Sequence, residues 1–159
     1  MGVLMSERQP PGETAFAARC AVVLDTNIVL DLLVFDDPAT HVLRQALDAG
    51  TVVWIAVSAM RTELERVLNY ADIFARVQAR GQTCAGVLAR FDQLSMRVDE
   101  PPTATIHCSD ADDQVFIDLA VAHRACLLSK DLAVVSLYKQ LARVGVQVSA
   151  ALGLVHGVA

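Results

Sequence analysis

The sequence predicts an α/β fold in which helices cover both faces of a central, mostly parallel sheet. Short apolar runs rich in β-branched residues alternate with longer segments whose apolar residues recur at helical spacing. Acidic residues follow several of these runs directly, where ligands bind in open parallel sheets. The length of 159 residues and the hydrophobic content of 54% suit one domain with a substantial core.

The first half of the chain predicts two strands and two helical segments. An uncharged apolar run predicts a strand over residues 20–24, and apolar spacing predicts a short helix over 27–35. Proline at the start and glycine just past the end mark a helix over 38–49. The next strand is expected over 52–57 and contains Trp54 as a core residue.

Ser58 is a suitable N-cap for a helix that runs to about residue 70. Residues 71–98 are expected to be helical, with an interruption near Gly81. The remaining expected elements are a helix over 111–124, a strand over 126–128, a helix over 131–143 and a short strand over 146–148.

These elements define a single domain over residues 19–152. The segment 1–18 has little periodicity and contains two prolines followed by glycine, so it is expected to be a flexible leader. Residues 153–159 are expected to form a tail.

Composition narrows the classes of function. The four cysteines have no CxxC spacing, so reduced, buried cysteines in a cytoplasmic protein are expected, with no zinc site. No apolar run reaches the ~18 residues of a membrane span, and no signal peptide is visible. The net charge of −5 argues against nucleic-acid binding through a general positive field. Any contact with nucleic acid would then have to use a local patch and a metal ion.

Acidic residues recur where predicted strands end and predicted helices begin. Asp25 ends the first strand, Asp131 follows the 126–128 strand, and Asp113 lies at the start of the intervening helix. Glu63, in the second turn of its helix, borders the apolar face. Helix capping, or a solvated position for Glu63, explains each acid singly. Together they predict a site for Mg²⁺ or Mn²⁺, which could activate water and offset charge on a phosphodiester.

Three acids near residue 113 are candidates for the metal ligand contributed by this segment. Asp110, Asp112 and Asp113 lie within four residues and repel one another, which is more acid than capping requires. Asp113 shares a helical stripe with the apolar face and is the inner candidate, with Asp112 as the substitute. Asp118 is expected on the solvent side.

The chain resembles the PIN domain family, and within it the toxin components of toxin–antitoxin systems. Four motifs carry the resemblance in order from about residue 20 to 150. They are Val22-Val23-Leu24-Asp25-Thr26-Asn27, Ser58 with Thr62-Glu63-Leu64, Asp110-Ala111-Asp112-Asp113 leading into Phe116-Ile117-Asp118-Leu119-Ala120, and Leu128-Ser129-Lys130-Asp131.

The resemblance implies a three-layer α/β/α fold with a central, mostly parallel sheet of about four or five strands. It implies an endoribonuclease that cuts single-stranded RNA with Mg²⁺ or Mn²⁺. It also implies a cognate antitoxin and a homodimer. If the 3′-oxygen is the leaving group, the product of such cutting carries a 5′-phosphate. By this resemblance Asp25, Glu63, Asp113 and Asp131 are the catalytic and metal-binding acids. The residues expected to support them are Thr26, Asn27, Ser129 and Asp110. The candidates for RNA contact are Lys130, Arg61 and Arg66, and the alternative for each of these three is a solvated surface charge.

Two departures from the family pattern and several alternatives remain. Residue 129 is Ser where the family often has Thr, and Lys130 replaces a small residue. A phosphatase of the haloacid dehalogenase type needs a second Asp two residues after Asp25, where this chain has Asn27. A receiver-like regulatory domain fits poorly because Ser58 stands near the acceptor position. A catalytically silent scaffold of the same fold that binds a protein or RNA partner also remains.

Overall fold

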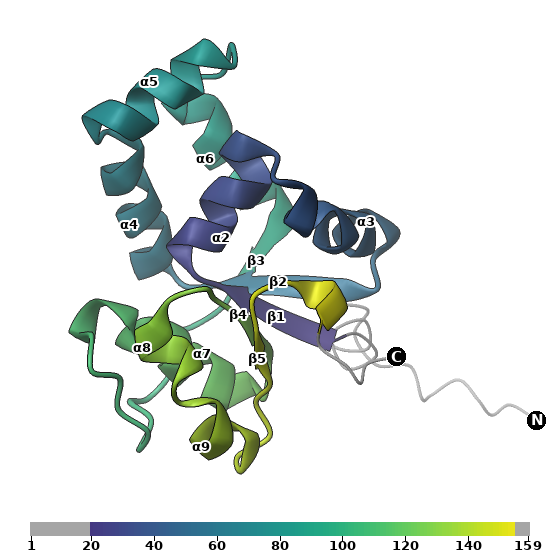
Figure 1. Ribbon diagram of the computed structural model, residues 1–159, viewed down its shortest axis with the longest axis vertical. Coiled ribbons are helices and arrows are strands. Elements are labelled where there is room, and N and C mark those ends of the chain that lie inside the picture. Colours follow the sequence, from purple (N-terminus) through teal and green to yellow (C-terminus); the bar gives the residue numbers. More distant parts are fainter. Residues whose placement is uncertain (1–19, 155–159) are drawn as a thin grey trace, which may run out of the picture.

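The computed structural model describes residues 20–154 and contains a five-stranded, all-parallel sheet with strand order β3-β2-β1-β4-β5 (Figure 1). The expected leader, 1–18, and most of the expected tail lie outside the described residues. The strands are β1 (Cys20–Leu24), β2 (Val52–Ala56), β3 (Ser95–Arg97), β4 (Cys126–Leu128) and β5 (Val148–Ser149). The predicted parallel α/β architecture is therefore confirmed.

The strand order reverses direction at β1. The chain moves from β1 outward through β2 to β3, then returns to the other side of β1 for β4 and β5. Val22 is paired with Trp54 of β2 on one side and with Cys126 of β4 on the other. In parallel sheets such a reversal opens a crevice at the carboxyl ends of the two strands, and ligands bind there.

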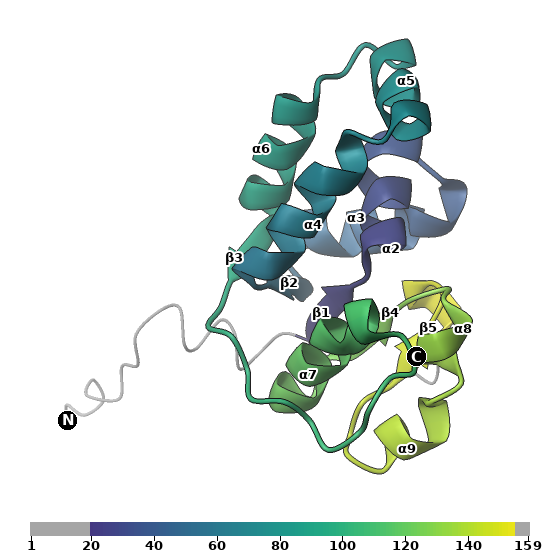
Figure 2. The ribbon, with the colours of Figure 1, turned by 90° about the vertical axis from the view of Figure 1, so that its left-hand side faces the viewer.

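Helices cover the sheet in two layers (Figures 1 and 2). The layer drawn above the sheet contains α2 (Thr26–Leu30), the π-helix η2 (Asp31–Phe35), the 3-10 turn η3 (Pro38–Thr40), α3 (His41–Ala49), α4 (Ser58–Leu68), α5 (Ala71–Ala79) and α6 (Cys84–Leu94). The opposite layer contains the 3-10 turn η4 (Ala111–Asp113), α7 (Gln114–His123), α8 (Leu132–Val135) and α9 (Tyr138–Ala142). A last 3-10 turn, η5, spans Leu152–Leu154.

The core lies between the sheet and these layers. All five residues of β2 are buried, and Trp54 packs edge-to-face on Phe91 of α6, with ring centroids 5.1 Å apart. Ile117 of α7 is buried on the other side of the sheet. Each such side chain contributes about 1.5–3 kcal/mol by leaving water, so the strand ends near the site are held on a rigid base. Within residues 20–154 no helix is long and apolar enough to cross a bilayer.

Several local predictions were wrong. Residues 95–97 are strand β3, not helix, because the Ser95 side chain donates to Phe91 O and the chain then pairs with the open edge of β2. Val57, not Ser58, is the N-cap of α4, and Ser58 Oγ instead accepts a hydrogen bond from Arg97.

Other predictions need smaller corrections. The expected 131–143 helix is split into α8 and α9, and the last strand lies at 148–149 instead of 146–148. All four cysteines are free as expected, but only Cys126 is buried, and Cys20 is exposed.

Candidate metal centre at the carboxyl edge of the sheet

The four acids expected at the site line one pocket of about 100 Å³. It lies where β1 and β4 end, at the reversal of strand order. Its lining residues are Asp25, Thr26, Asn27, Glu63, Val67, Asp113, Phe116 and Asp131. The structure therefore brings together acids that are up to 106 residues apart in sequence, since Asp25 and Asp131 share this pocket.

Asp25 is the buried anchor of the pocket. It ends β1 and caps α2, because its Oδ1 accepts the Ile28 N–H at 2.9 Å. Its Oδ2 accepts a hydrogen bond from the Ser129 hydroxyl. Burial raises the pKa of Asp25 above its ordinary value, while the hydrogen bonds from Ser129 and Ile28 favour the carboxylate and oppose that rise. The two oxygens are thus fixed in orientation.

Asp131 occupies the equivalent position after β4. Its Oδ1 accepts the Ala133 N–H at 2.9 Å, so it caps α8 as the capping interpretation predicted. The fully buried Ser129 hydroxyl also accepts the Asp131 N–H at 3.1 Å. Ser129 therefore links the two strand-end acids, which supports its expected orienting role.

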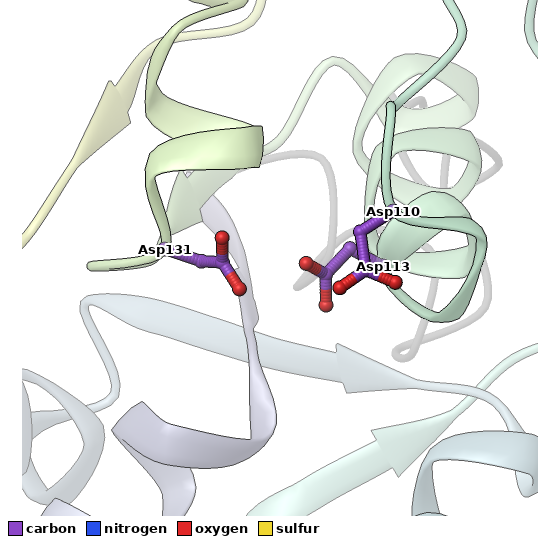
Figure 3. Close-up of side chains that lie close together, drawn as sticks. All are labelled: Asp110, Asp113 and Asp131. Atoms are coloured by element: carbon purple, nitrogen blue, oxygen red, sulfur yellow. The ribbon is translucent and has the colours of Figure 1, made fainter.

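Asp113 and Asp110 face Asp131 from the turn that precedes α7, as Figure 3 shows. One carboxylate oxygen from each of these three acids lies within 4.8 Å of the other two. Burial, a hydrogen bond to Asp131 and repulsion from that acid raise the pKa of Asp113 to about 7. Its Oδ2 is buried without a hydrogen-bond partner. A cation would satisfy that oxygen and remove the repulsion.

Glu63 reaches the pocket from α4 and forms an ion pair with Arg66. Arg66 donates from Nη2 to Glu63 Oε1 at 2.7 Å and from Nη1 to the Tyr70 hydroxyl at 2.8 Å. Glu63 lines the pocket but is not in the group of three acids that lie within 4.8 Å. The Arg66 guanidinium therefore stands at the pocket rim, next to one of the expected metal ligands.

The remaining candidates lie away from the pocket or are engaged. Asp112 is exposed and is not among the lining residues, although its N–H donates to Asp110. Lys130 is paired with Asp31 of η2 at 2.5 Å. Arg61 makes a two-point contact with Asp92 of α6, at 2.8 and 3.0 Å.

The solvent-side prediction for Asp118 was wrong. Its Oδ1 accepts hydrogen bonds from the Ala104 N–H and from Gln114, both at 2.8 Å. This carboxylate holds the long loop before η4 against α7, and so positions the turn that carries Asp110 and Asp113. Helical spacing alone places Asp118 on the solvent-facing side of α7. The loop that covers it there comes from a tertiary contact, which spacing cannot predict.

Sequence reasoning also missed Asp31 and the apolar walls of the pocket. Asp31 is buried and compensated by Lys130, 99 residues later, so no local pattern could have linked them. Val67 and Phe116 close the apolar side. Helical spacing predicted both residues as core positions, but not as walls of the pocket.

The donor set fits a hard divalent cation. The candidate ligands are all carboxylate oxygens, the ligands that Mg²⁺ and Mn²⁺ prefer, and one buried oxygen of Asp113 has no partner. Asp25, Asp113 and Asp131 approach from three different elements, which allows coordination from several directions.

Comparison with known proteins gives one finding. A family model described as a PIN domain matches residues 21–133, which run from β1 to the first residues of α8 and include all four pocket acids. No curated protein and no solved structure gives a match.

Proposed function

Because this chain belongs to the PIN domain family, whose members are generally Mg²⁺-dependent nucleases, we propose that it is an endoribonuclease that cuts single-stranded RNA. The observation that carries this proposal is the meeting of Asp25, Glu63, Asp113 and Asp131 in one pocket. A carboxylate pocket on a chain of net charge −5 repels a phosphodiester unless a cation intervenes. The chemistry therefore depends on metal.

Each acid has a distinct position in the proposed site. Asp25, Asp113 and Asp131 would hold Mg²⁺ or Mn²⁺, with Asp110 and Glu63 at its margin. When bound, the ion supplies Lewis-acid chemistry: it makes water a better nucleophile at neutral pH and offsets charge that builds on the phosphate. Release of the 3′-oxygen would leave a 5′-phosphate on the product.

The protein's own groups orient these acids. Ser129 holds one oxygen of Asp25 and the Asp131 backbone, so the two carboxylates keep their spacing. Thr26 and Asn27 line the pocket beside Asp25, and Asn27 is exposed enough to contact substrate. Phe116 and Val67 exclude water from one side.

Arg66 is the best candidate for an RNA phosphate contact. It is exposed at the rim, and it can turn from Glu63 toward a phosphate oxygen when that acid contacts a cation. Tyr70, also exposed, lies beside it and offers a surface on which a base can stack. Arg61 and Lys130 are weaker candidates, because Asp92 and Asp31 already hold them.

We propose further that the protein is the cytoplasmic toxin of a toxin–antitoxin pair and forms a homodimer. The subtype rests on the resemblance described above, and the free cysteines favour a reducing compartment. Phe74 of α5 is an exposed apolar side chain that suits a contact surface. Sedimentation at micromolar concentration tests the dimer: a monomer contradicts it.

The nuclease is tested with a 5′-labelled single-stranded RNA in Mg²⁺, Mn²⁺ or EDTA. We expect cutting with either metal, 5′-phosphate product ends, and no cutting in EDTA or by Asp25→Asn. The matched control is Asp99→Asn, which neutralises an exposed acid outside the pocket and should cut normally.

A folded protein that cuts nothing with either metal would contradict the nuclease and favour the catalytically silent scaffold. Hydrolysis of a phosphate monoester with no cutting of RNA would instead favour the phosphatase alternative.

A further inference from the structure

A second pocket lies at the far end of the helical segment that begins after Asp25. Its volume is about 290 Å³, and it shares no lining residue with the acidic pocket. The lining residues are Leu32, Leu33, Val34, Asp36, Arg44, Arg80, Gln82 and Arg90. In Figure 1, α2 and its continuation run from the sheet edge near α8 towards α5 and α6, so the two pockets lie at opposite ends of one helical segment.

This arginine pocket has the opposite charge to the rest of the chain. Arg44, Arg80 and Arg90 line it against the single acid Asp36, whereas the chain as a whole carries −5. Asp36 is more than half exposed and lies 3.4 Å from His41 and 3.8 Å from Arg44. The pocket therefore keeps a local excess of positive charge that attracts anions.

Two of the arginines also have a structural role. Arg44 donates to Leu32 O at 2.8 Å, and Arg90 donates to Leu33 O at 3.1 Å, so they satisfy carbonyls at the end of the helical segment. These bonds use one nitrogen of each guanidinium, which carries five N–H donors in total. Capping alone leaves most of the donors unused.

Three polar groups in the pocket have no partner within residues 20–154. The guanidinium of the exposed Arg80 makes no hydrogen bond or ion pair with those residues. Arg44 Nε and Gln82 Oε1 are buried without a hydrogen-bond partner. The Gln82 amide orientation is fixed, because its Nε2 donates to Leu33 O at 3.3 Å. The pocket thus offers unused cationic donors beside one unused acceptor.

We propose that the arginine pocket binds a nucleotide, with its phosphate on the arginines and a hydroxyl or amino group on Gln82 Oε1. Guanidinium groups bind phosphate oxygens in two-point contacts. The unused acceptor requires a ligand that also donates, as ribose and the bases do. The volume of about 290 Å³ is close to the roughly 300 Å³ at which small-molecule pockets begin, and is more than a bare anion needs.

The nucleotide can come from two sources: a free mononucleotide, or one unit of an RNA strand. The RNA source rests on the proposed nuclease function. Leu33 lies eight positions after Asp25, which places the pockets roughly 12 Å apart along the helical segment. The mononucleotide source does not depend on nuclease activity at all.

The test is calorimetric titration of the full-length protein in EDTA, where no cutting occurs. The probes are AMP, adenosine, inorganic phosphate and a short single-stranded RNA. The variant is Arg80→Gln, which removes a side chain without structural contacts. The matched control is Arg143→Gln, which removes the same charge from an exposed arginine outside the pocket.

We expect AMP to bind the wild type and Arg143→Gln equally, and Arg80→Gln roughly tenfold more weakly. Adenosine and inorganic phosphate should each bind more weakly than AMP. RNA binding that is also weakened by Arg80→Gln would identify the strand as the source, whereas AMP binding alone would identify the free nucleotide.

Equal AMP affinity of wild type and Arg80→Gln would overturn the proposal, as would no binding of AMP. Binding of a polyglutamate peptide in place of AMP would also overturn it and make the pocket a protein contact. Because none of these readouts requires metal or cutting, failure of the nuclease proposal leaves the AMP result intact.

Discussion

Asp113→Asn should stabilise the metal-free protein at alkaline pH. Burial and the neighbouring Asp131 raise the pKa of Asp113 from 3.8 to about 7. The folded state therefore holds this proton more tightly than the unfolded state, and folding takes up a proton between those two values. The contribution of Asp113 to the free energy of unfolding is therefore largest below about pH 4 and is lost as the pH rises through 7.

The size of the effect follows from the same numbers. The interval from 3.8 to about 7, at about 1.4 kcal/mol per pH unit, gives an upper limit of about 4 kcal/mol. Asp113 is only half-buried, so solvent screening reduces this to about 1–2 kcal/mol. Asparagine removes the charge while keeping the shape, so it should recover that amount at pH 8, part of it at pH 5 and almost none below about pH 4.

The assay is urea unfolding in EDTA, followed through the fluorescence of the buried Trp54. Asp99→Asn is the control for loss of one exposed negative charge. Added Mg²⁺ should stabilise the wild type more than Asp113→Asn, because only the wild type has repulsion at this position to relieve. A variant that is less stable than wild type at pH 8, or no different from the control, would refute the reasoning.

Three further predictions concern groups around the site. Ser129→Ala removes both hydrogen bonds that link the strand-end acids, and should lower the free energy of unfolding by about 1–3 kcal/mol and reduce RNA cutting, while the exposed Ser136→Ala changes neither. Lys130→Ala leaves its buried carboxylate partner without a cation and should cost about 1–2 kcal/mol in urea unfolding. Asp118→Ala should accelerate hydrogen exchange at the Ala104 amide, because that amide loses its acceptor; unchanged exchange would contradict the loop-anchoring role.

The sequence identified the candidate site because parallel strands end at a common edge. Asp25 and Asp131 follow strands that pair directly, with Leu24 opposite Leu128, so recognising the two strands was enough to bring the acids together. Asp113 was preferred over Asp112 by helical spacing, and the pocket includes only Asp113 of the two. Strand ends and helical spacing were therefore enough to predict which of these acids lie in the pocket.

Features decided by distant partners could not be read in the same way. Ser95 follows a helical pattern, yet it enters the sheet because β2 has an open edge beside it. Arg61 looked like a free surface charge until Asp92 of another helix came within 2.8 Å. In both cases the deciding group is more than 30 residues away, where neither propensity nor spacing carries information.

The continuous segment from α2 through η2 explains why opposite charges gather at its two ends. Aligned peptide dipoles make the start of a helix favourable for anions and its end favourable for cations. Asp25 caps the first turn, and Arg44 and Arg90 bind carbonyls of the last. The segment thus holds the acidic pocket at one end and the arginine pocket at the other, and a substitution that shifts it would disturb both. Lys130 contacts its middle at Asp31, so Lys130→Ala should alter AMP binding and RNA cutting together, whereas Arg80→Gln should alter AMP binding without changing the geometry of the acidic pocket.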